Sequence, residues 1–457
     1  FLNDGAGGFS DEAPRLGIDI RDASLMSAFC DYDRDGDLDV YLLTHRVFSE
    51  GMMVTFADEV ERPADTATSL QEMLPLHIKD VRLTADNRIA PEHREHFFKL
   101  GSTTEGGKKY LKINLAGQRD VLLRNDSVNG SGRFTDVTEQ AGVTDYGLGL
   151  SATWMDFDCD GHPDLHVAND LYTRDRLYRN QGDGTFTEVL ETMLPHTPWF
   201  SMGADFADIN NDGRFDFLVA DMSGSSHYRA KIFMGNMQPH LWFLNHEWPR
   251  QAMRNALYLG TGTSRYLEAA HMCGLDSTDW TWAVRFADLD NDGNCDAFFT
   301  NGFARDIMNP DLYEIQFGRI LNTQGVQAAV SHMRDIPPLR QENLAFRNAG
   351  NLRFENTSAA WGLNHHGISH GAAYADLDRD GDLDLVVNNL NEPVSIYRND
   401  SAQGHGVLFR LVGVSSNRYG LGTKLTIETG STTQIRQLSP TRGFMSADEP
   451  LVHFGLG

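Results

Sequence analysis

Residues 374–387 read Tyr-Ala-Asp-Leu-Asp-Arg-Asp-Gly-Asp-Leu-Asp-Leu-Val-Val, and this stretch contains the motif that decides the fold. Its core, Asp376–Asp384, follows the pattern D-x-[DN]-x-D-G-x-x-D. The pattern recurs at Asp31–Asp39, Asp156–Asp164, Asp208–Asp216 and Asp288–Asp296. Carboxylates this close together repel one another unless a cation lies among them. Five copies of such a motif would rarely occur by chance, so the motif predicts a set of cation-binding loops.

The spacing gives each odd position of the loop a role. Positions 1, 3 and 5 supply side-chain oxygens, position 7 a backbone carbonyl and position 9 a last carboxylate, while the Gly at position 6 predicts a positive φ. Hard oxygen ligands in a flexible loop favour Ca²⁺ over Mg²⁺, and no thiolate or imidazole cluster favours a softer metal. The sequence therefore predicts up to five calcium ions. The predicted ligands are Asp31, Asp33, Asp35, Asp37 and Asp39; Asp156, Asp158, Asp160, His162 and Asp164; Asp208, Asn210, Asp212, Arg214 and Asp216; Asp288, Asp290, Asp292, Asn294 and Asp296; and Asp376, Asp378, Asp380, Asp382 and Asp384.

An EF-hand begins with the same residues but needs a Glu at position 12 and a helix on each side. Position 12 is apolar in every copy here, as in Leu42 and Val387, and β-type runs such as Phe217-Leu218-Val219 follow the loops. The loops are therefore expected to join two strands. The third loop is the weakest candidate, because Asn210 and Arg214 lower its formal charge. The alternative is an Asp/Gly-rich hairpin that binds no ion.

A second motif alternates with the acidic loop and predicts a hairpin. Its clearest copy is Leu177–Phe186, where an Asn/Gly turn separates two short strand-like runs. One repeat thus contains four short strands, and repeated four-stranded units predict the blades of a β-propeller. The loop starts are 125, 52, 80 and 88 residues apart, so the longer intervals contain insertions.

The expected architecture is all-β. It consists of a propeller over residues 1–400, with six or seven four-stranded blades and seven favoured for the full-length protein, followed by a small β domain over 401–457. Helical or loop insertions are expected at about 44–118, 223–255 and 305–339, with Pro91–Leu100 as a candidate helix. Insertions on one face of a propeller usually carry the individual function.

The sequence Phe206-Ala207-Asp208 before an acidic loop, with similar triplets at 286–288 and 374–376, resembles the FG-GAP/VCBS repeats. This family builds calcium-loop β-propellers, including the integrin α-subunit head, and the resemblance is to its secreted bacterial branch. The tail, with Ser416–Gly422 and His453–Gly457, is similar to the ASPIC/UnbV domain and looks cut short relative to it. The resemblance implies an extracellular calcium-binding protein in adhesion, matrix or surface assembly. It supplies no catalytic residue.

Composition limits the class of protein. The net charge of −25 and the lack of a basic stripe argue against nucleic-acid binding, and no apolar run is long enough to span a membrane. Four cysteines are too few for a disulfide scaffold; one disulfide or buried free thiols are both expected outcomes. Weak calcium sites suit the extracellular space, so a secreted or surface-exposed location is expected. Sequons occur at Asn125, Asn129, Asn356 and Asn399.

Other candidate sites are weaker. His93 and His96 lack the spacing of a helical zinc motif, and Trp242–Trp248 is more typical of insertion packing than of sugar stacking. His365, His366 and His370 form the remaining candidate metal or catalytic cluster. No nucleophile elbow, P-loop or dinucleotide motif is present.

The leading hypothesis is a non-enzymatic extracellular calcium-binding propeller in adhesion, scaffolding or self-assembly, including a fibre or surface-layer subunit. Its partners would be a protein or a carbohydrate at the cell surface or matrix, or further copies of the chain. The alternative is a carbohydrate- or protein-binding module of a larger secreted enzyme. A third hypothesis makes the chain itself an enzyme acting through the His365–His370 region.

Overall fold

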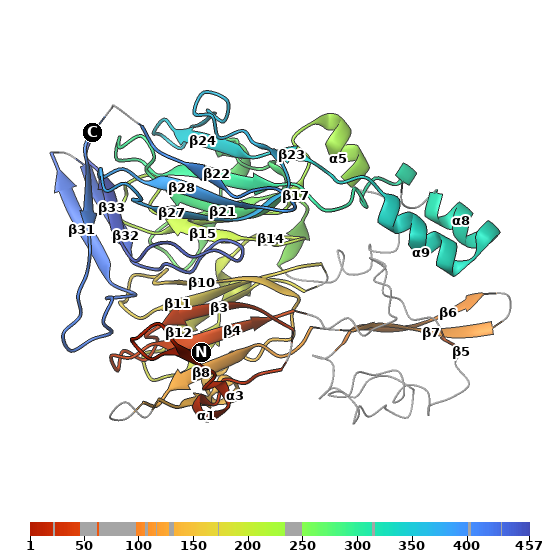
Figure 1. Cartoon of the computed structure of the whole chain (residues 1–457), viewed down its shortest axis with the longest axis horizontal. Helices are drawn as coiled ribbons and strands as arrows, with labels where there is room; N and C mark the ends of the chain where they lie inside the picture. The colour runs from red at the N-terminus through yellow and green to blue at the C-terminus, as the bar shows by residue number, and fades with distance from the viewer. Residues whose placement is uncertain are drawn as a thin grey trace.

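The computed structural model describes residues 1–21, 23–45, 62–63, 97–105, 108–115, 117–127, 132–171, 173–233, 249–312, 316–400, 404–430 and 432–457. These residues are mainly β-structure, and their sheets succeed one another around a common axis (Figure 1). The expectation of an all-β propeller is confirmed. The blades, the insertions and the C-terminal segment are described in turn below.

Five successive antiparallel sheets form the blades, and each begins with an inner strand. The first contains β3 (Ser24–Cys30), β4 (Asp39–Thr44), β8 (Val121–Asn125) and β9 (Phe134–Asp136). The second contains β10 (Gly149–Met155), β11 (Asp164–Asn169), β12 (Arg176–Asn180) and β13 (Phe186–Glu188). The third contains β15 (Ala204–Ala207), β16 (Asp216–Val219), β19 (Ala256–Gly260) and β20 (Tyr266–Glu268).

The last two blades do not have four strands: the fourth has five and the fifth has three. The fourth contains β21 (Asp279–Ala287), β22 (Asp296–Asn301), β24 (Leu344–Asn348) and β25 (Phe354–Asn356), and the short β17 (Met222–Ser223) joins its inner edge. The fifth contains β27 (Ser369–Ala375), β28 (Asp384–Asn389) and β29 (Ser395–Tyr397). A separate hairpin of β1 (Leu2–Asn3) and β2 (Phe9–Ser10) precedes the first blade. The described residues therefore form five blades, fewer than the six or seven expected.

Each acidic loop joins the first two strands of its blade, and each Asn/Gly hairpin joins the third and fourth. The residue before a loop pairs with the Asp that ends it, as Cys30 pairs with Asp39 and Ala207 with Asp216. Core side chains lie between neighbouring blades, because a blade sheet has two covered faces. Trp154 of the second blade, for example, packs with Tyr41 of the first. One-turn helices follow the fourth strands of the first three blades: α3 (Thr138–Ala141), α4 (Leu190–Met193) and α7 (Ala270–Cys273). A similar turn, α1 (Ala13–Leu16), follows the β1–β2 hairpin.

The insertions lie at the end of the blades opposite the acidic loops. They contain β5 (Arg62–Pro63), β6 (Phe97–Glu105) and β7 (Lys108–Leu115), then α5 (His227–Phe233), α8 (Gln316–Gln324) and α9 (Val326–Asp335). Two small sheets at their bases pair β14 (His196–Pro198) with β18 (Arg250–Ala252), and β23 (Gln341–Glu342) with β26 (His366–Gly367). The candidate helix Pro91–Leu100 is wrong in its described part, because residues 97–100 belong to β6, which forms an antiparallel hairpin with β7.

The C-terminal segment, here called the cap (residues 404–457 where described), lies at the other end of the blades (Figure 1). It contains β30 (Gly406–Phe409), β31 (Lys424–Thr429), β32 (Thr432–Gln437) and β33 (Val452–Gly455). β31 pairs with β32, β30 pairs with β33, and a small core around Leu438 and Phe454 joins the two pairs. The cap and the insertions thus occupy opposite faces of the propeller.

The cap also sends a segment along the propeller axis. The Gly443 amide donates to Ala204 O of β15 at 2.7 Å, and Gly443 O accepts from Ser151 Oγ of β10 at 2.6 Å. Ser446 Oγ accepts from the Ala372 amide of β27 at 3.0 Å. Because these partners lie on inner strands of different blades, the segment fills the centre of the propeller.

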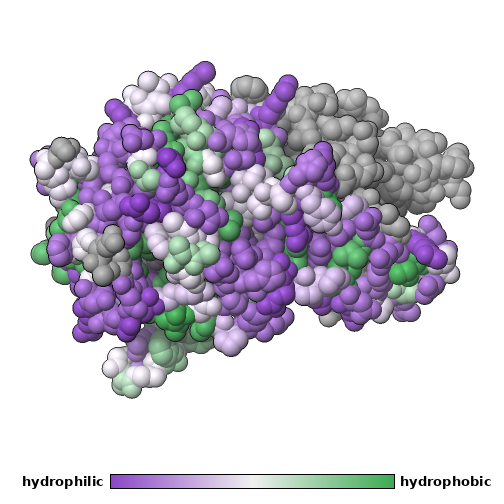
Figure 2. Space-filling model, turned by 90° about the horizontal axis from the view of Figure 1, so that it is seen from above, coloured by the Kyte–Doolittle hydropathy of each residue, from purple (hydrophilic) through white to green (hydrophobic). Residues whose placement is uncertain are grey.

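The outer surface is polar. In the view of Figure 2 hydrophilic side chains dominate, and apolar ones form only small groups between them. In the described residues, no helix combines the length and the apolar character needed to cross a bilayer.

Candidate metal loops and their surroundings

The fold brings three carboxylates of one loop together in four of the five loops. The carboxylates of positions 1, 3 and 9 lie with one oxygen each within 4.8 Å of one another. The four groups are Asp31, Asp33 and Asp39; Asp156, Asp158 and Asp164; Asp288, Asp290 and Asp296; and Asp376, Asp378 and Asp384. Each group could hold a metal ion between oxygens, which suits a hard cation.

Positions 5 and 7 of each loop stand outside these groups of three. The carboxylate of position 5 instead accepts the backbone N–H of position 7, at 2.8 Å from His162 to Asp160 and at 3.1 Å from Asp37 to Asp35. The same bond recurs in the other loops, at 3.0 Å from Asp382 to Asp380. These residues shape the turn, and their role as ligands, including that of Asn294 and Asp292, stays a prediction.

The loop backbone enters the left-handed region twice. The Gly at position 6 has positive φ in all five copies, for instance 103° at Gly36 and 82° at Gly213. Position 4 does too, at Arg34, Cys159, Asn211, Asn291 and Arg379, with φ between 56° and 65°. A non-Gly residue pays for this conformation in strain of order 1–2 kcal/mol. The recurrence at the same position five times shows that the turn geometry requires it, which the sequence pattern did not reveal.

The Asp at position 9 has a structural role in every loop. One oxygen of Asp164 accepts the Phe157 amide of its own loop at 3.1 Å, and the other accepts the Asn180 amide of the third strand at 2.8 Å. The equivalent pairs of bonds form at Asp39, Asp216, Asp296 and Asp384. Position 9 therefore joins the acidic loop to the next hairpin, whether or not an ion is bound.

The third loop differs as its composition suggests. Asn210 replaces a carboxylate at position 3, and Arg214 Nη1 lies 3.3 Å from Asp212 Oδ2 within the same loop. Asp208 and Asp216 still accept backbone N–H groups as in the other copies. This loop has the lowest negative charge of the five.

The electrostatics of the loops favour a bound cation. Burial raises the pKa of Asp39 to about 8, of Asp164 to about 9 and of Asp288 to about 7, and neighbouring carboxylates add to each shift. One buried oxygen each of Asp156 and Asp288 has no hydrogen-bond partner. Buried carboxylate oxygens without partners are costly, and a cation would neutralise them, so the residues present fit a divalent ion.

The fold disperses the candidate cluster of His365, His366 and His370. Among the histidines, His365 pairs with Glu392 at 3.0 Å, His366 is exposed on β26, and His370 packs against Trp282. They do not form one site, so the third hypothesis loses its proposed catalytic cluster. His93, His96, Trp242–Trp248 and Asn129 lie outside the described residues.

The cysteines are Cys30, Cys159, Cys273 and Cys295, and all four are free thiols. Cys295 is buried in the core between the third and fourth blades, as its position in the loop indicates. No disulfide contributes to the described fold.

Sequence reasoning missed the role of the Asn in the hairpin motif. Asn180 Nδ2 donates to Tyr32 O of the first blade's loop at 2.9 Å and to Pro163 O of its own blade at 3.0 Å. Asn348 and Asn399 bridge to the preceding loops in the same way, through Ile209 O and Leu289 O. The third blade has Gly260 at this point, and the Tyr266 hydroxyl bonds to Phe157 O instead. The regular alternation of the two motifs was the available signal.

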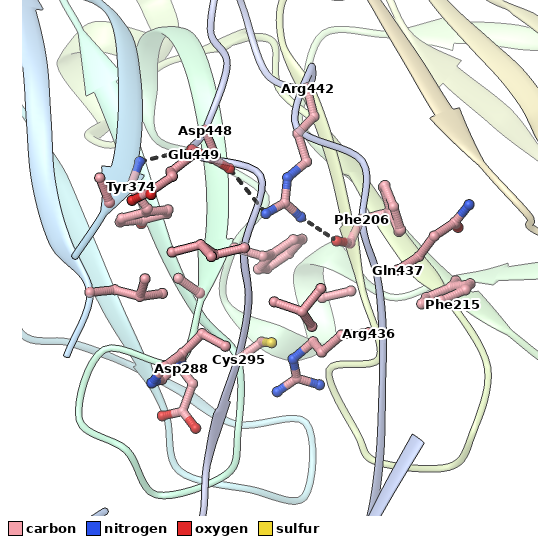
Figure 3. A pocket seen from close by; sticks show the side chains of 18 residues that line it. Phe206, Phe215, Asp288, Cys295, Tyr374, Arg436, Gln437, Arg442, Asp448 and Glu449 are labelled. Atoms are coloured by element: carbon pink, nitrogen blue, oxygen red, sulfur yellow. Dashed lines mark hydrogen bonds and ion pairs between the residues drawn. The ribbon is translucent and has the colours of Figure 1, made fainter. Parts of the chain in front are cut away.

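A compact charged network lies where the cap enters the propeller, and Figure 3 shows two of its members, Arg442 and Asp448. The Arg285 side chain is fully buried and pairs with Asp448 of the cap. Arg442 of the cap lies 3.2 Å from Asp205 Oδ1 and 3.1 Å from Asp448 Oδ2. Two arginines and two aspartates thus neutralise one another, which is what a buried charge cluster requires.

Comparison with known proteins agrees with the fold. Residues 156–219 match the FG-GAP-like repeat family, and residues 413–457 match the family described as ASPIC and UnbV. The chain therefore contains an FG-GAP-like repeat and a C-terminal ASPIC/UnbV domain.

The curated relatives share less than a quarter of their aligned residues with this chain. Cartilage acidic protein 1 from Mus musculus is 22% identical over 346 residues, covering 73% of this chain and 44% of the relative. The Homo sapiens protein is 23% identical over 348 residues, with 73% and 42% covered, and the Xenopus tropicalis protein is 24% identical over 287 residues, with 62% and 36% covered. The chain spans less than half the length of these relatives.

Proposed function

We propose that this chain is an extracellular calcium-binding propeller that acts in adhesion or scaffolding and has no catalytic activity of its own. The observation that carries the proposal is the recurrence of one carboxylate group, formed by positions 1, 3 and 9, in four loops on one face of the molecule. The unpartnered buried oxygens of Asp156 and Asp288 support an ion at two of them.

Calcium is favoured over other cations by the ligand chemistry. The groups contain carboxylate oxygens without His or Cys, and hydrogen bonds within a flexible turn set their arrangement. Such sites suit Ca²⁺, whereas Mg²⁺ demands a near-octahedral shell and keeps its waters. Sites of moderate affinity are filled at millimolar extracellular calcium, which supports a location outside the cell.

The mechanism proposed for the ions is stabilisation of the blades. Each ion would neutralise the carboxylates of one loop, and the loop contacts the next hairpin through position 9 and the neighbouring blade through the hairpin Asn. Several blades would then gain stability together. The partner would be a protein or a carbohydrate, and the polar outer surface gives no preference between them.

The alternative function is a binding module of a larger secreted enzyme. The matched relatives are more than twice as long as the part that this chain covers. Sequencing the complete gene would show whether a hydrolase or lyase domain accompanies the propeller.

The test is calorimetric titration of the purified chain with CaCl₂ after removal of divalent ions, together with thermal unfolding in calcium and in chelator. We expect several sites per chain and a higher melting temperature in calcium. Absence of calcium binding, or equal melting temperatures, would refute the proposal. Magnesium at the same concentration is the control and should stabilise less.

A further inference from the structure

The cap contacts the acidic loops directly. Asn417 Nδ2 lies 3.3 Å from Asp31 Oδ2 in the first loop, and the Asp156 amide of the second loop donates to Gln437 Oε1 at 3.0 Å. The Gly457 amide donates to Asn291 O of the fourth loop at 2.9 Å. The cap is therefore seated on the faces of three predicted metal loops.

The approach to the fourth loop is especially close. A Cβ on Gly455 would lie 2.0 Å from Asp288 Oδ2 and 2.6 Å from the backbone of Asn291. Only Gly permits this packing, since any side chain would collide with a carboxylate and with backbone atoms. The cap thus covers position 1 of the fourth loop without a gap.

Position 1 is buried in the three loops that the cap contacts and also in the third loop, at Asp208, but not in the fifth. Asp31, Asp156 and Asp288 expose 7%, 4% and 2% of their surface, whereas Asp376 of the fifth loop is only partly buried, and the following Leu377 is 53% exposed. The cap approaches the fifth loop at Gly381, where a Cβ on Gly406 would lie 2.9 Å from Gly381 O. Position 1 of the fifth loop is therefore less covered than in the other loops and serves as an internal control.

Covering a carboxylate that lacks a partner has an energetic consequence. The buried unpartnered oxygens of Asp156 and Asp288 would disfavour seating of the cap as long as these groups are ionised and no cation is present. A cation at the loop removes this penalty. By linkage, whatever favours the seated cap also raises the affinity of the covered loops for the cation, by the same factor.

We propose that calcium binding at the first, second and fourth loops and docking of the cap onto the propeller strengthen each other, with weaker coupling at the fifth loop, where Asp376 stays partly exposed. This inference rests on the calcium binding proposed above. It makes the cap part of the metal-dependent structure and turns the cap–propeller contact into a calcium-responsive interface.

Hydrogen exchange followed by mass spectrometry tests the coupling on the full chain. Peptides from β31–β33 and from residues 440–449 should exchange slowly in CaCl₂ and faster after chelation. Calorimetric titration with CaCl₂ on the same samples separates the two proposals. Calcium binding with unchanged protection of the cap would overturn the coupling alone, and absence of calcium binding would overturn both.

Two pairs of variants sharpen the test. Gly455→Ala should lower the calcium affinity of the chain about fivefold or more, in the usual range of coupling between sites, whereas Gly318→Ala, which has open space around it, should not. Asp288→Asn removes a buried charge. In this variant, hydrogen exchange of the cap should therefore respond less to chelation than in the wild type. In Asp376→Asn, hydrogen exchange of the cap should respond to chelation as it does in the wild type. Equal responses of Asp288→Asn and Asp376→Asn would overturn the inference, even if Gly455→Ala does not fold.

Discussion

The side-chain amide of Asn180 donates a hydrogen bond of 2.9 Å to the carbonyl oxygen of Tyr32, across the boundary between the second and first blades. The same amide donates to Pro163 O, and its Oδ1 accepts from the Gly182 amide. One buried side chain thus forms hydrogen bonds with backbone groups of two loops and of a turn. This bond explains why an Asn recurs where any turn-forming residue would seem sufficient.

Replacement of this side chain should destabilise the propeller. Asn180→Ala leaves the buried carbonyls of Tyr32 and Pro163 without donors, and each such group costs about 1–3 kcal/mol. We expect a loss of about 2–4 kcal/mol in the free energy of unfolding, measured by urea denaturation in calcium. The neighbouring Gln181→Ala is the control, because Gln181 is exposed and should change stability by less than about 0.5 kcal/mol. Equal effects of both variants would contradict the interblade role.

The loops should differ in calcium affinity. Asp156→Asn removes position 1 of a loop with three gathered carboxylates, whereas Asp208→Asn alters the loop in which Arg214 already pairs with Asp212. We therefore expect Asp156→Asn to abolish one tight site in a calorimetric calcium titration. Asp208→Asn should change only the part of the calcium titration that reports the weakest site. Loss of a tight site in Asp208→Asn would show that the charge argument is wrong.

Loss of one member of the charged network between cap and propeller should destabilise the protein. Asp448→Ala leaves Arg285 and Arg442 with Asp205 alone, and breaking a buried pair costs about 3–5 kcal/mol. Denaturant unfolding followed by tryptophan fluorescence measures this loss. The adjacent Glu449→Ala should cost less than about 1 kcal/mol, because its pair with Arg410 is at the surface. A small effect of Asp448→Ala would mean that the central segment is held by its backbone bonds.

Acidification should weaken the cap through His453. Burial, with a smaller contribution from the nearby Arg436, lowers the pKa of His453 to about 4. Asp288 and Glu449 line the same pocket. The unfolded chain binds a proton on this residue below about pH 6.5, and the folded chain only below about pH 4. The contribution of His453 to the free energy of unfolding should therefore fall by up to about 3 kcal/mol between pH 6.5 and 4.

His453→Phe removes the titrating ring and is the matched variant for this measurement. Its unfolding free energy, determined by urea denaturation at a fixed calcium concentration, should decrease less than that of the wild type over the same pH range. Parallel pH profiles of the two proteins would rule out His453 as the source.

Several features of the fold follow from local sequence alone. The acidic loops and the Asn/Gly hairpins are short-range patterns, so the strands on either side of Asp156–Asp164 and around Gly182 are predictable without a structure. The gathering of positions 1, 3 and 9 also follows, since a tight nine-residue turn leaves these side chains few directions. The sequence missed positive φ at position 4, because residues as different as Arg34, Cys159 and Asn291 occupy it.

The blade count lay beyond local patterns. Motif copies suggested six or seven blades, whereas the described residues form five, because the β1–β2 hairpin carries the Asn/Gly motif but stays a two-stranded sheet. The histidines near residue 370 illustrate the same limit, since neighbours in sequence point to Glu392 and to Trp282 in different parts of the fold.

The sequence by itself determined the repeated strand–loop–strand unit and its carboxylates, because hydrogen bonds and charges within about ten residues fix both. Only the tertiary structure decided which carboxylates are covered and which remain open. Gly455 reaches Asp288, and Asn417 reaches Asp31 across 386 residues, while Asp376 stays partly exposed. These contacts depend on how the chain closes around its axis and returns its end through the centre, and no local pattern encodes that path.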